Sequence, residues 1–527
     1  MVRLTLLVLA ACSSAPLAPG GSSFEASDTG YGDWDSDADT DADTDADTDV
    51  DTDTDTDTDT DTDTDTDTDT GDAETDTADT DTADTDTDTE ACDDTSPVTL
   101  YLSPDDSNSM SSPVQVRDAV LGGRDSLRNV PIRTWEFLNY YGFDYVAPET
   151  GLSVTPLLVP GEAAGTFVLQ IGVASPTVTL ADREPLNVVF VLDTSGSMGG
   201  TSMDLLKAST RAMVSNLREG DIVSMVEWST TNAVHLEEYR VREQDDPIIL
   251  DEIDALEAGG GTDLNAGLEA GYDIAARTFD PTRINRVVLV SDGGANAGVT
   301  SETLIARHAG TGDDAGIYLV GVGVGSASTY DDTLMDTVTD VGRGASVFIG
   351  TEAEALHQFG PAGFLQVMDV AYRDVGVRLE LPPGFEITRF SGEEYSTDPR
   401  EIEPQHIAPN DAMVFYQTLE TCAPELATDD AELTVSVRYT DPLTLEELTT
   451  SVTARFGDLY AEDTRLLDKG AAVYAYAEAL RACQEGAESA WPTLLAPALA
   501  RLEQAERTNP GDTDLAELRR VMEALGG

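Results

Sequence analysis

The middle of the chain alternates short apolar runs with segments whose apolar residues recur at helical spacing. Near-continuous apolar runs are typical of buried parallel strands, and they occur at Leu186–Leu192, Val287–Val290 and Ile317–Val322. Three more strands are predicted at Ile222–Trp228, Ala233–Leu236 and Ser346–Ile349. The helices predicted between the strands are Met203–Leu217, Leu264–Phe279, Ser301–His308, Asp331–Val338 and Glu352–Met368. This alternation predicts an α/β fold with a doubly wound, Rossmann-like parallel sheet.

The chain on either side of this region has other patterns. After it, apolar and polar residues alternate in runs such as Val375–Leu381, Ala412–Thr418 and Leu433–Tyr439, which predicts a β-rich, sandwich-like module. The tail from Asp463 to Leu525 is predicted to be helical, because its apolar residues fall on one helical face. We therefore expect an N-terminal flanking region at 97–185, an α/β domain at 186–368, a β-rich module at 369–458 and a helical C-terminal segment at 459–527.

Residues 12–96 are dominated by aspartate. Almost every second residue from Asp35 onward is Asp, and unbroken Asp-Thr pairs fill Asp51–Thr70. The segment has too few apolar residues to bury a core, and its like charges repel one another, so we expect a disordered acidic stalk. It lacks the glycines and spaced glutamates of an EF-hand loop, so we expect only loose binding of cations there.

Charge excludes some partners. The 527 residues include 29 Lys+Arg and 101 Asp+Glu, for a formal net charge of −72. So acidic a chain repels nucleic acid and anionic lipid surfaces, and we expect neither as a partner. Because 40% of the residues are hydrophobic, sizeable cores can still form outside the stalk.

The first residues have the features of an export signal. Residues 1–11 combine one basic residue with a short apolar run, and Leu9, Ala10 and Ala11 precede Cys12 as in the bacterial lipobox, which they resemble. The resemblance implies a lipoprotein signal peptide, acylation of Cys12 and a membrane anchor made of lipid alone. Ser13 stands where an inner-membrane retention signal would have Asp, which implies a cell-envelope protein anchored in the outer membrane, on its periplasmic face or at the cell surface.

Three loops of the α/β region have oxygen-bearing side chains. Asp193–Ser197 (D-T-S-G-S) follows the first strand, Gly259–Asp263 (G-G-G-T-D) precedes the second helix, and Ser291–Gly294 (S-D-G-G) follows the Val287–Val290 strand. In doubly wound folds, ligands bind at the carboxyl ends of the strands, where these loops should meet. Each loop alone is a weak signal, since Ser, Thr and Asp are ordinary turn and N-cap residues.

Together and in this order, the loops resemble the metal-ion-dependent adhesion site (MIDAS) of the von Willebrand factor type A (VWA) domain. The resemblance implies five metal ligands, which are Asp193, Ser195, Ser197, Thr262 and Asp292. In that family the serines ligate directly, the aspartates bind directly or through water, and the threonine joins in the ligand-bound form. The all-oxygen set suits Mg²⁺, with Mn²⁺ or Ca²⁺ as alternatives. The family's last coordination position takes an acidic side chain of a protein partner, so we expect adhesion, that is, protein binding.

Two further segments narrow the resemblance. Pro131–Tyr145 and Asn285–Val299 are similar to stretches of a bacterial family that has a conserved region before the VWA domain and a C-terminal domain of unknown function after it. The similarity extends over about Asp105–Leu525, which is all of the chain except leader and stalk. This similarity implies metal-dependent binding of a protein partner, but it does not indicate which protein that partner is.

Two other classes of function fit parts of the sequence. In the first, the protein is a structural envelope protein whose metal site only rigidifies its loops. In the second it is an enzyme, such as a metal-dependent hydrolase. We expect no enzyme, because the glycines of Gly321–Gly325 lack the spacing of a dinucleotide loop. No histidine lies beside the strand ends to act as a base; the four are His235, His308, His357 and His406.

The number and positions of the cysteines are relevant to the cellular compartment of the protein. With Cys12 assigned to lipid, Cys92, Cys422 and Cys483 remain. A disulfide between Cys422 and Cys483 is feasible in an oxidising periplasm, because both lie in regions predicted to fold. The alternative is that both are free buried thiols.

Overall fold

The computed structural model describes residues 92–93, 95–103, 109–123, 127–294, 303–305, 316–460 and 463–526. The predicted signal peptide, Cys12 and nearly all of the predicted stalk lie outside the described residues, as does most of the helix predicted at Ser301–His308. Within the described ranges, every helix is too short or too polar to span a membrane.

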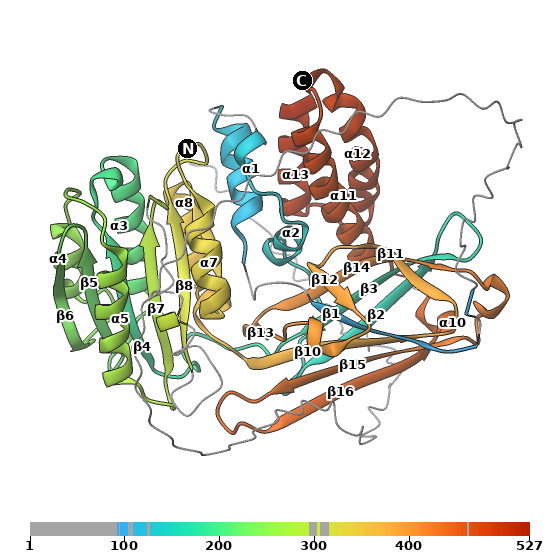
Figure 1. Ribbon diagram of the computed structural model, residues 1–527, viewed down its shortest axis with the longest axis horizontal. Helices are drawn as coiled ribbons and strands as arrows, with labels where there is room; N and C mark the ends of the chain where they lie inside the picture. The colour runs from blue at the N-terminus through green and yellow to red at the C-terminus, as the bar shows by residue number, and fades with distance from the viewer. Residues whose placement is uncertain are drawn as a thin grey trace, which may run out of the picture. The chain divides into compact units, whose positions relative to one another are not determined.

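The α/β domain is built on a six-stranded sheet with strand order β6-β5-β4-β7-β8-β9 (Figure 1). Its strands are β4 (Leu186–Asp193), β5 (Ile222–Trp228), β6 (Asn232–Arg240), β7 (Ile284–Ser291), β8 (Ile317–Val324) and β9 (Ser346–Ile349). All neighbours are parallel except β5 and β6, which form an antiparallel hairpin. Its helices are α3 (Thr201–Val214), α4 (Pro247–Ala255), α5 (Leu264–Thr278), α7 (Asp332–Gly342), α8 (Glu352–Phe359) and α9 (Phe364–Met368).

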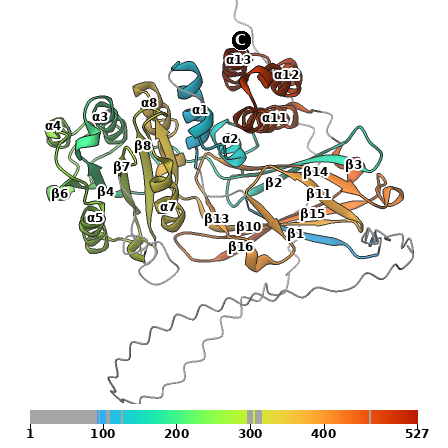
Figure 2. The same ribbon diagram turned by 45° about the horizontal axis from the view of Figure 1, so that its top comes forward.

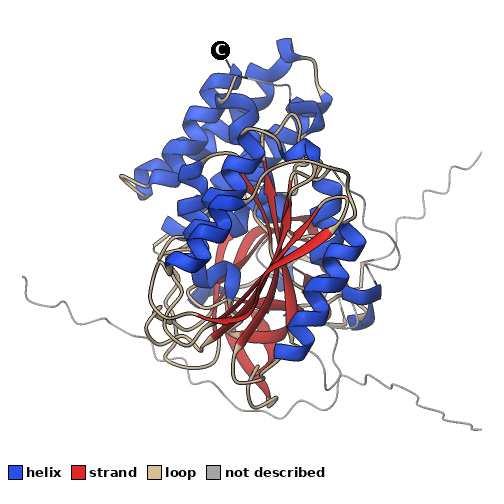
Figure 3. Cartoon of the chain, turned by 90° about the vertical axis from the view of Figure 1, so that its left-hand side faces the viewer, coloured by secondary structure: helices blue, strands red, loops and turns tan. Residues whose placement is uncertain are grey.

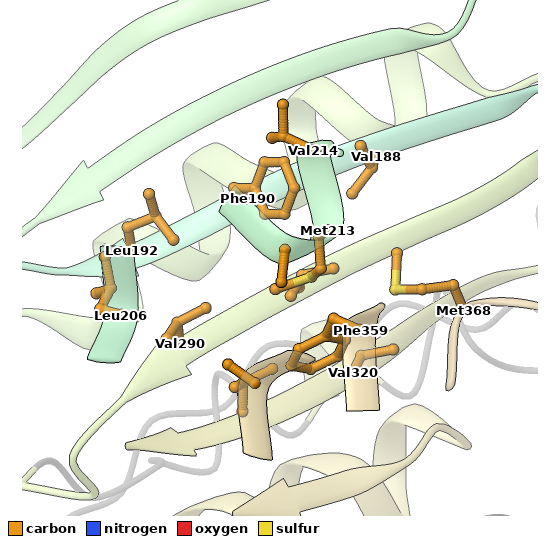
Figure 4. Close-up of a cluster of buried hydrophobic side chains, with 14 of the residues drawn as sticks. Val188, Phe190, Leu192, Leu206, Met213, Val214, Val290, Val320, Phe359 and Met368 are labelled. Carbon is orange, nitrogen blue, oxygen red and sulfur yellow. The ribbon is translucent and has the colours of Figure 1, made fainter. Parts of the chain in front are cut away.

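Helices cover both faces of this sheet (Figure 3). Because side chains alternate along a strand, β4 sends Phe190 to one face and Val191 to the other. Phe190 packs in a cluster with Met213 of α3 and Phe359 of α8 (Figure 4), whereas Val191 belongs to the cluster that includes Tyr272 of α5. The predicted doubly wound α/β fold is confirmed.

The helices of this domain differ from the sequence prediction in one division and one addition, besides small shifts of their ends. The helix predicted at Glu352–Met368 is two helices, because Gly360 and Pro361 stand between α8 and α9, and proline cannot continue the hydrogen-bond ladder. Helix α4 was not predicted. It begins at Pro247, and the side chain of the preceding Asp246 accepts a hydrogen bond from the Ile248 amide at 3.1 Å, which is a start signal readable from sequence.

The β-rich part is a sandwich of two antiparallel sheets. One has the order β12-β1-β10-β15-β16 with β13 paired to β10, and the other has the order β11-β14-β3-β2. The strands are β1 (Val98–Ser103), β2 (Ser153–Pro160), β3 (Thr166–Ala174), β10 (Tyr372–Leu381), β11 (Phe385–Phe390), β12 (Glu394–Ser396), β13 (Gln405–Ile407), β14 (Ala412–Thr421), β15 (Glu432–Thr440) and β16 (Glu447–Arg455).

The α/β domain is inserted into this sandwich. Strands β1, β2 and β3 come from the predicted N-terminal flanking region, yet β1 pairs with β10 and β3 pairs with β14. One buried cluster joins Ile171 of β3 to Leu379 of β10 and Phe415 of β14. The regions that the sequence analysis separates as 97–185 and 369–458 therefore share both sheets and one core.

The remaining helices form a second group beside the α/β domain. Helices α1 (Ser111–Leu121) and α2 (Thr134–Tyr140) share a buried cluster with the C-terminal helices (Figure 2). Those are α11 (Arg465–Glu485), α12 (Trp491–Thr508) and α13 (Thr513–Gly526), and a single turn, α10 (Phe456–Leu459), follows β16. The helical tail predicted from Asp463 onward is thus present, and residues before the α/β domain complete its core.

Two arginines join this helical group to the α/β domain. Arg117 of α1 contacts Glu354 of α8 and lies 3.0 Å from Glu517 of α13. Arg133, which precedes α2, lies 2.6 Å from Asp332 of α7 and 3.1 Å from Glu136. Both arginines are mostly buried, and each bridges carboxylates that would otherwise repel one another.

The disulfide predicted between Cys422 and Cys483 is wrong. Cys483 is a free thiol, buried in the cluster of the helical group, and burial raises its pKa to about 11. Cys422 follows β14 in the sandwich, where its amide donates to the Gly384 carbonyl at 3.0 Å. Cys92 and Cys422 are both disulfide-bonded. The two predicted partners therefore lie in different parts of the fold, Cys422 at the surface of the sandwich and Cys483 inside the helical group.

Buried carboxyls give stability a pH dependence. Burial raises the pKa of Glu136 to about 7 against the opposing attraction of Arg133, and burial raises the pKa of Asp369 and Asp411 to about 6. These groups hold their protons more tightly in the folded chain, so the free energy of unfolding should rise as pH falls from about 7 towards 5. Denaturation at pH 7.5 and 5.5 measures this. The Glu136→Gln variant should show a flatter dependence, and an unchanged slope would contradict the role of Glu136.

Candidate metal-binding site

Two of the predicted loops meet at the carboxyl edge of the α/β sheet. Strands β4 and β7 are parallel neighbours, with Leu192 opposite Val290, so Asp193 and Asp292 stand at adjacent strand ends. The Ser195 amide donates to Oδ1 of Asp193 at 2.8 Å, and the Ser291 hydroxyl donates to Oδ2 at 2.6 Å. Both oxygens of the buried Asp193 carboxylate are therefore fixed.

A row of hydrogen bonds continues from Asp193 towards the surface. The hydroxyls of Ser195 and Ser197 lie 3.1 Å apart, and the Ser197 hydroxyl donates to Oδ1 of Asp292 at 3.2 Å. The Gly294 amide donates to the same oxygen at 3.0 Å. Asp193 and Ser195 are buried while Ser197 is exposed, so the row leads from the interior to the surface. We call these four predicted ligands, Asp193, Ser195, Ser197 and Asp292, the oxygen row.

The glycine loop lies against the first loop. The Gly259 amide donates to the Thr194 carbonyl at 2.7 Å, and the Gly196 amide donates to the Gly260 carbonyl at 3.3 Å. Gly260 has a φ of +88°, a left-handed conformation that favours glycine. Thr262 is exposed, and no hydrogen bond joins it to the oxygen row within the described part of the chain. Its role as a ligand stays a prediction.

A polar cavity opens beside the oxygen row. It has a volume of about 610 Å³ and is lined by Ser197 and Asp292 on one side and by Ser326, Thr329 and Asp331 of the β8–α7 loop on the other. Gly293, with a φ of +79°, packs on the backbone of Asp331, where an added Cβ would lie 2.1 Å from its carbonyl oxygen. The Ser291–Gly294 loop is therefore in direct contact with Asp331, the residue before α7.

The charges of the site favour a hard cation. Burial raises the pKa of Asp193, and the nearby Asp292 carboxylate adds to that rise, while hydrogen bonds from Ser291 and Ser195 oppose it. No Lys, Arg or His pairs with either carboxylate among the residues that the structure describes. The donors are carboxylates and hydroxyls, which suit Mg²⁺. The described residues hold no cluster of three or more His, Cys, Asp or Glu that would suit zinc.

Comparison with known proteins agrees with this geometry. Residues 187–361 match the family model of the von Willebrand factor type A domain. The chain contains a VWA domain. It is 30% identical over 221 residues to the uncharacterized protein YfbK of Escherichia coli strain K12, covering 42% of this chain and 37% of that protein. It is 26% identical over 215 residues to an uncharacterized protein of Synechocystis, covering 41% of this chain and 49% of that protein.

The chain thus spans less than half the length of these two relatives. A solved VWA protein from Catenulispora acidiphila is 18% identical with a TM-score of 0.44, covering 71% of this chain and 89% of that one. VWA domains generally mediate protein–protein interaction, often through a MIDAS, and proteins that contain them are typically not enzymes.

Sequence reasoning missed a group of side chains that supports the first loop of the VWA domain. The Thr194 hydroxyl donates to Glu227 of β5 at 2.9 Å, and His235 of β6 lies 2.5 Å from Glu227 and 3.0 Å from Glu252 of α4. Burial lowers the pKa of His235, but its hydrogen bonds to the two glutamates outweigh burial and raise it. The two strands predicted at Ile222–Trp228 and Ala233–Leu236, with only a short polar segment between them, were the available signal that Glu227 and His235 are close.

Proposed function

We propose that this protein binds a protein partner through a divalent metal ion, Mg²⁺ by preference, at the MIDAS of its VWA domain. The oxygen row supports the proposal most directly, because four of the five predicted ligands form one hydrogen-bonded set that no Lys, Arg or His of the described residues neutralises. When bound, the metal supplies a positive centre that accepts a carboxylate from the partner.

The side chains of the site have distinct roles in this proposal. Ser195 and Ser197 present neutral oxygens, and Asp193 and Asp292 supply the negative charge that attracts the cation. Ser291 orients Asp193 through its 2.6 Å hydrogen bond. Because Ser197 is exposed at the mouth of the polar cavity, a partner can reach this end of the row. Thr262, on the adjacent loop, is proposed to join the set when a partner is bound.

We also propose the cellular setting that the sequence implies. Lipid on Cys12 would attach the chain to the outer membrane, and residues 12–96 would act as a stalk that separates the folded part from the membrane surface. The chain's strongly acidic character supports a protein partner rather than nucleic acid.

The proposal is tested by capture from a cell-envelope extract on the immobilised full chain. With Mg²⁺, the wild-type chain and Asp280→Ala, which changes a half-buried carboxylate near the other end of β7, should retain the same partner. Chelator or Asp193→Ala should remove it, and blocking the extract's carboxyl groups with carbodiimide and ethanolamine should prevent its capture. If the partner is retained equally with and without metal, and equally by Asp193→Ala, the proposal is contradicted. A metal-dependent rise in melting temperature without any capture would favour the structural alternative.

A further inference from the structure

A second cavity lies at the opposite end of the VWA sheet, where the domain meets the sandwich. It has a volume of about 530 Å³. Arg286 and Tyr318, which line it, stand near the amino ends of β7 and β8, whereas the oxygen row lies at the carboxyl ends of β4 and β7. The sandwich contributes Arg373 of β10 and the loop between β15 and β16. The cavity is therefore separate from the metal site.

Two guanidinium groups flank one tyrosine ring in this cavity. The Cζ atom of Arg286 lies 5.1 Å from the centre of the Tyr318 ring, and that of Arg373 lies 5.9 Å from it. Arg286 is only 4% exposed and donates to the Asn285 carbonyl at 2.9 Å. Within the described ranges, neither arginine forms a salt bridge. A buried guanidinium that forms no salt bridge is costly, and burial lowers the pKa of Arg286 although the charge of Asp369 opposes the change.

Within the part of the chain that the structure describes, several buried polar atoms around the same ring have no hydrogen-bond partner. They are the Tyr318 hydroxyl, Nε of Arg373 and Nε2 of His406, whose ring centre lies 4.8 Å from that of Tyr318. Tyr318 is 4% exposed and His406 is 2% exposed. Since buried polar groups in folded proteins are nearly always paired, this concentration indicates a ligand that supplies acceptors.

The balance of charge around the cavity favours a single negative charge. Arg183 and Arg283 also line it, but they pair with Asp221 and Asp280. Asp441 accepts hydrogen bonds from its own loop, at 2.9 Å from the Leu443 amide and 2.8 Å from the Thr444 amide. Asp182 and Glu184 stand at the exposed rim.

Asp369, which also lines the cavity, is the acid whose charge acts on Arg286. Burial raises its pKa to about 6, although the attraction of Arg286 opposes the rise, so near neutral pH it is largely ionised. Two guanidinium groups against one carboxylate leave a net charge of about +1, which matches a monoanion better than a dianion.

The other part of the lining is apolar. Phe279, Ile284 and Val370 line the cavity together with Leu443 and Leu445, whose side chains are 59% and 64% exposed. Such leucines on a loop can close over an apolar group. The cavity volume also falls within the range of small-molecule sites, about 300–1,000 Å³.

We propose that this cavity binds a small organic carboxylate with an apolar tail. The carboxylate lies between Arg286 and Arg373 and accepts a hydrogen bond from the Tyr318 hydroxyl, and the tail packs on Phe279 and the leucines of the β15–β16 loop. Planar guanidinium groups match the geometry of a carboxylate, which can accept from both.

Calorimetric titration of the full chain with octanoate tests this proposal. Chelator is present throughout, so that carboxylate binding by a metal at the MIDAS cannot contribute. Octanoate should bind at least about tenfold more tightly than octanol, since a charge-assisted hydrogen bond is worth a factor of about ten or more. Octyltrimethylammonium, which has the same tail and the opposite charge, should not bind.

Substitutions in the second cavity test whether octanoate binds there. Arg373→Gln should weaken octanoate binding about tenfold or more, and Tyr318→Phe, which removes an unpaired hydroxyl and keeps the ring, should weaken it several-fold. Arg400→Gln at the surface and Tyr476→Phe, which removes a buried hydroxyl in the helical group, should leave it unchanged. If Arg373→Gln fails to fold, Tyr318→Phe still decides. Equal binding of octanoate and octanol, or octanoate binding that ignores both Arg373→Gln and Tyr318→Phe, would overturn the proposal.

Discussion

Magnesium should raise the melting temperature of the VWA domain in the wild-type chain and leave that of Asp193→Ala unchanged. A cation that binds the folded state alone stabilises it by about 2.7 kcal/mol at a concentration a hundredfold above its Kd. For a domain of this size, that corresponds to a rise of roughly 5–10 °C. Asp193 is fully buried and fixed through both oxygens, so no other side chain can replace its carboxylate.

The variant should still fold. The cores on the two faces of the sheet are built by the apolar residues of β4, β7 and β8, and Asp193 belongs to neither. Asp193→Asn, which keeps an acceptor for the Ser195 amide, serves as a second variant. Ser195→Ala and Thr262→Ala should give intermediate shifts, because each removes one neutral oxygen. All of these chains keep the acidic residues 12–96, so loose cation binding there is the same in each. If none of Mg²⁺, Mn²⁺ and Ca²⁺ changes the melting temperature of the wild-type chain, the predicted metal site is contradicted.

Arg133→Met should lower the free energy of unfolding by about 3 kcal/mol. The arginine lies 3.1 Å from Glu136 and 2.6 Å from Asp332, whose side chains are 1% and 10% exposed. Its removal leaves these buried carboxylates without a cation, and breaking one partner of a buried pair costs about 3–5 kcal/mol. Because Arg133 is itself 20% exposed, we expect the lower end of that range.

Chemical denaturation at two pH values measures this effect. The loss should be smaller at pH 5.5 than at pH 7.5, because burial raises the pKa of Glu136 to about 7 and the protonated group no longer repels Asp332. The matched control is Arg400→Met, whose side chain is 81% exposed and pairs only with Asp398 in the described structure. It should cost less than about 1 kcal/mol. Equal losses in the two variants would show that the bridges of Arg133 are worth no more than a surface pair.

Local patterns predicted the doubly wound α/β fold and the edge of the sheet at which Asp193 and Asp292 lie. Continuous apolar runs specify buried strands, and the doubly wound order then places Asp193 beside Asp292. The β1–β10 pairing was not predicted, because it joins segments on opposite sides of the VWA domain and periodicity shows only local structure. For the same reason, the sequence did not indicate that Arg133 and Asp332 form an ion pair. Ser291 orients Asp193 through a hydrogen bond. The sequence shows that Ser291 lies at a strand end, but a serine in that position does not by itself indicate this role.

The pairing of β1 with β10 determines how the sandwich responds to tension. Val98 at the start of β1 lies opposite Leu381 at the end of β10, so the two strands begin at opposite ends of their ladder. In the proposed setting, tension from the lipid anchor first meets the disulfide-bonded Cys92, and it acts on the start of β1 only when that disulfide is reduced; a bound partner pulls, through the VWA domain, on the start of β10. Inter-strand hydrogen bonds lie perpendicular to the strands, so this force shears the whole ladder at once rather than opening it pair by pair. With that disulfide reduced, the ladder would resist extension between the proposed anchor and the proposed partner.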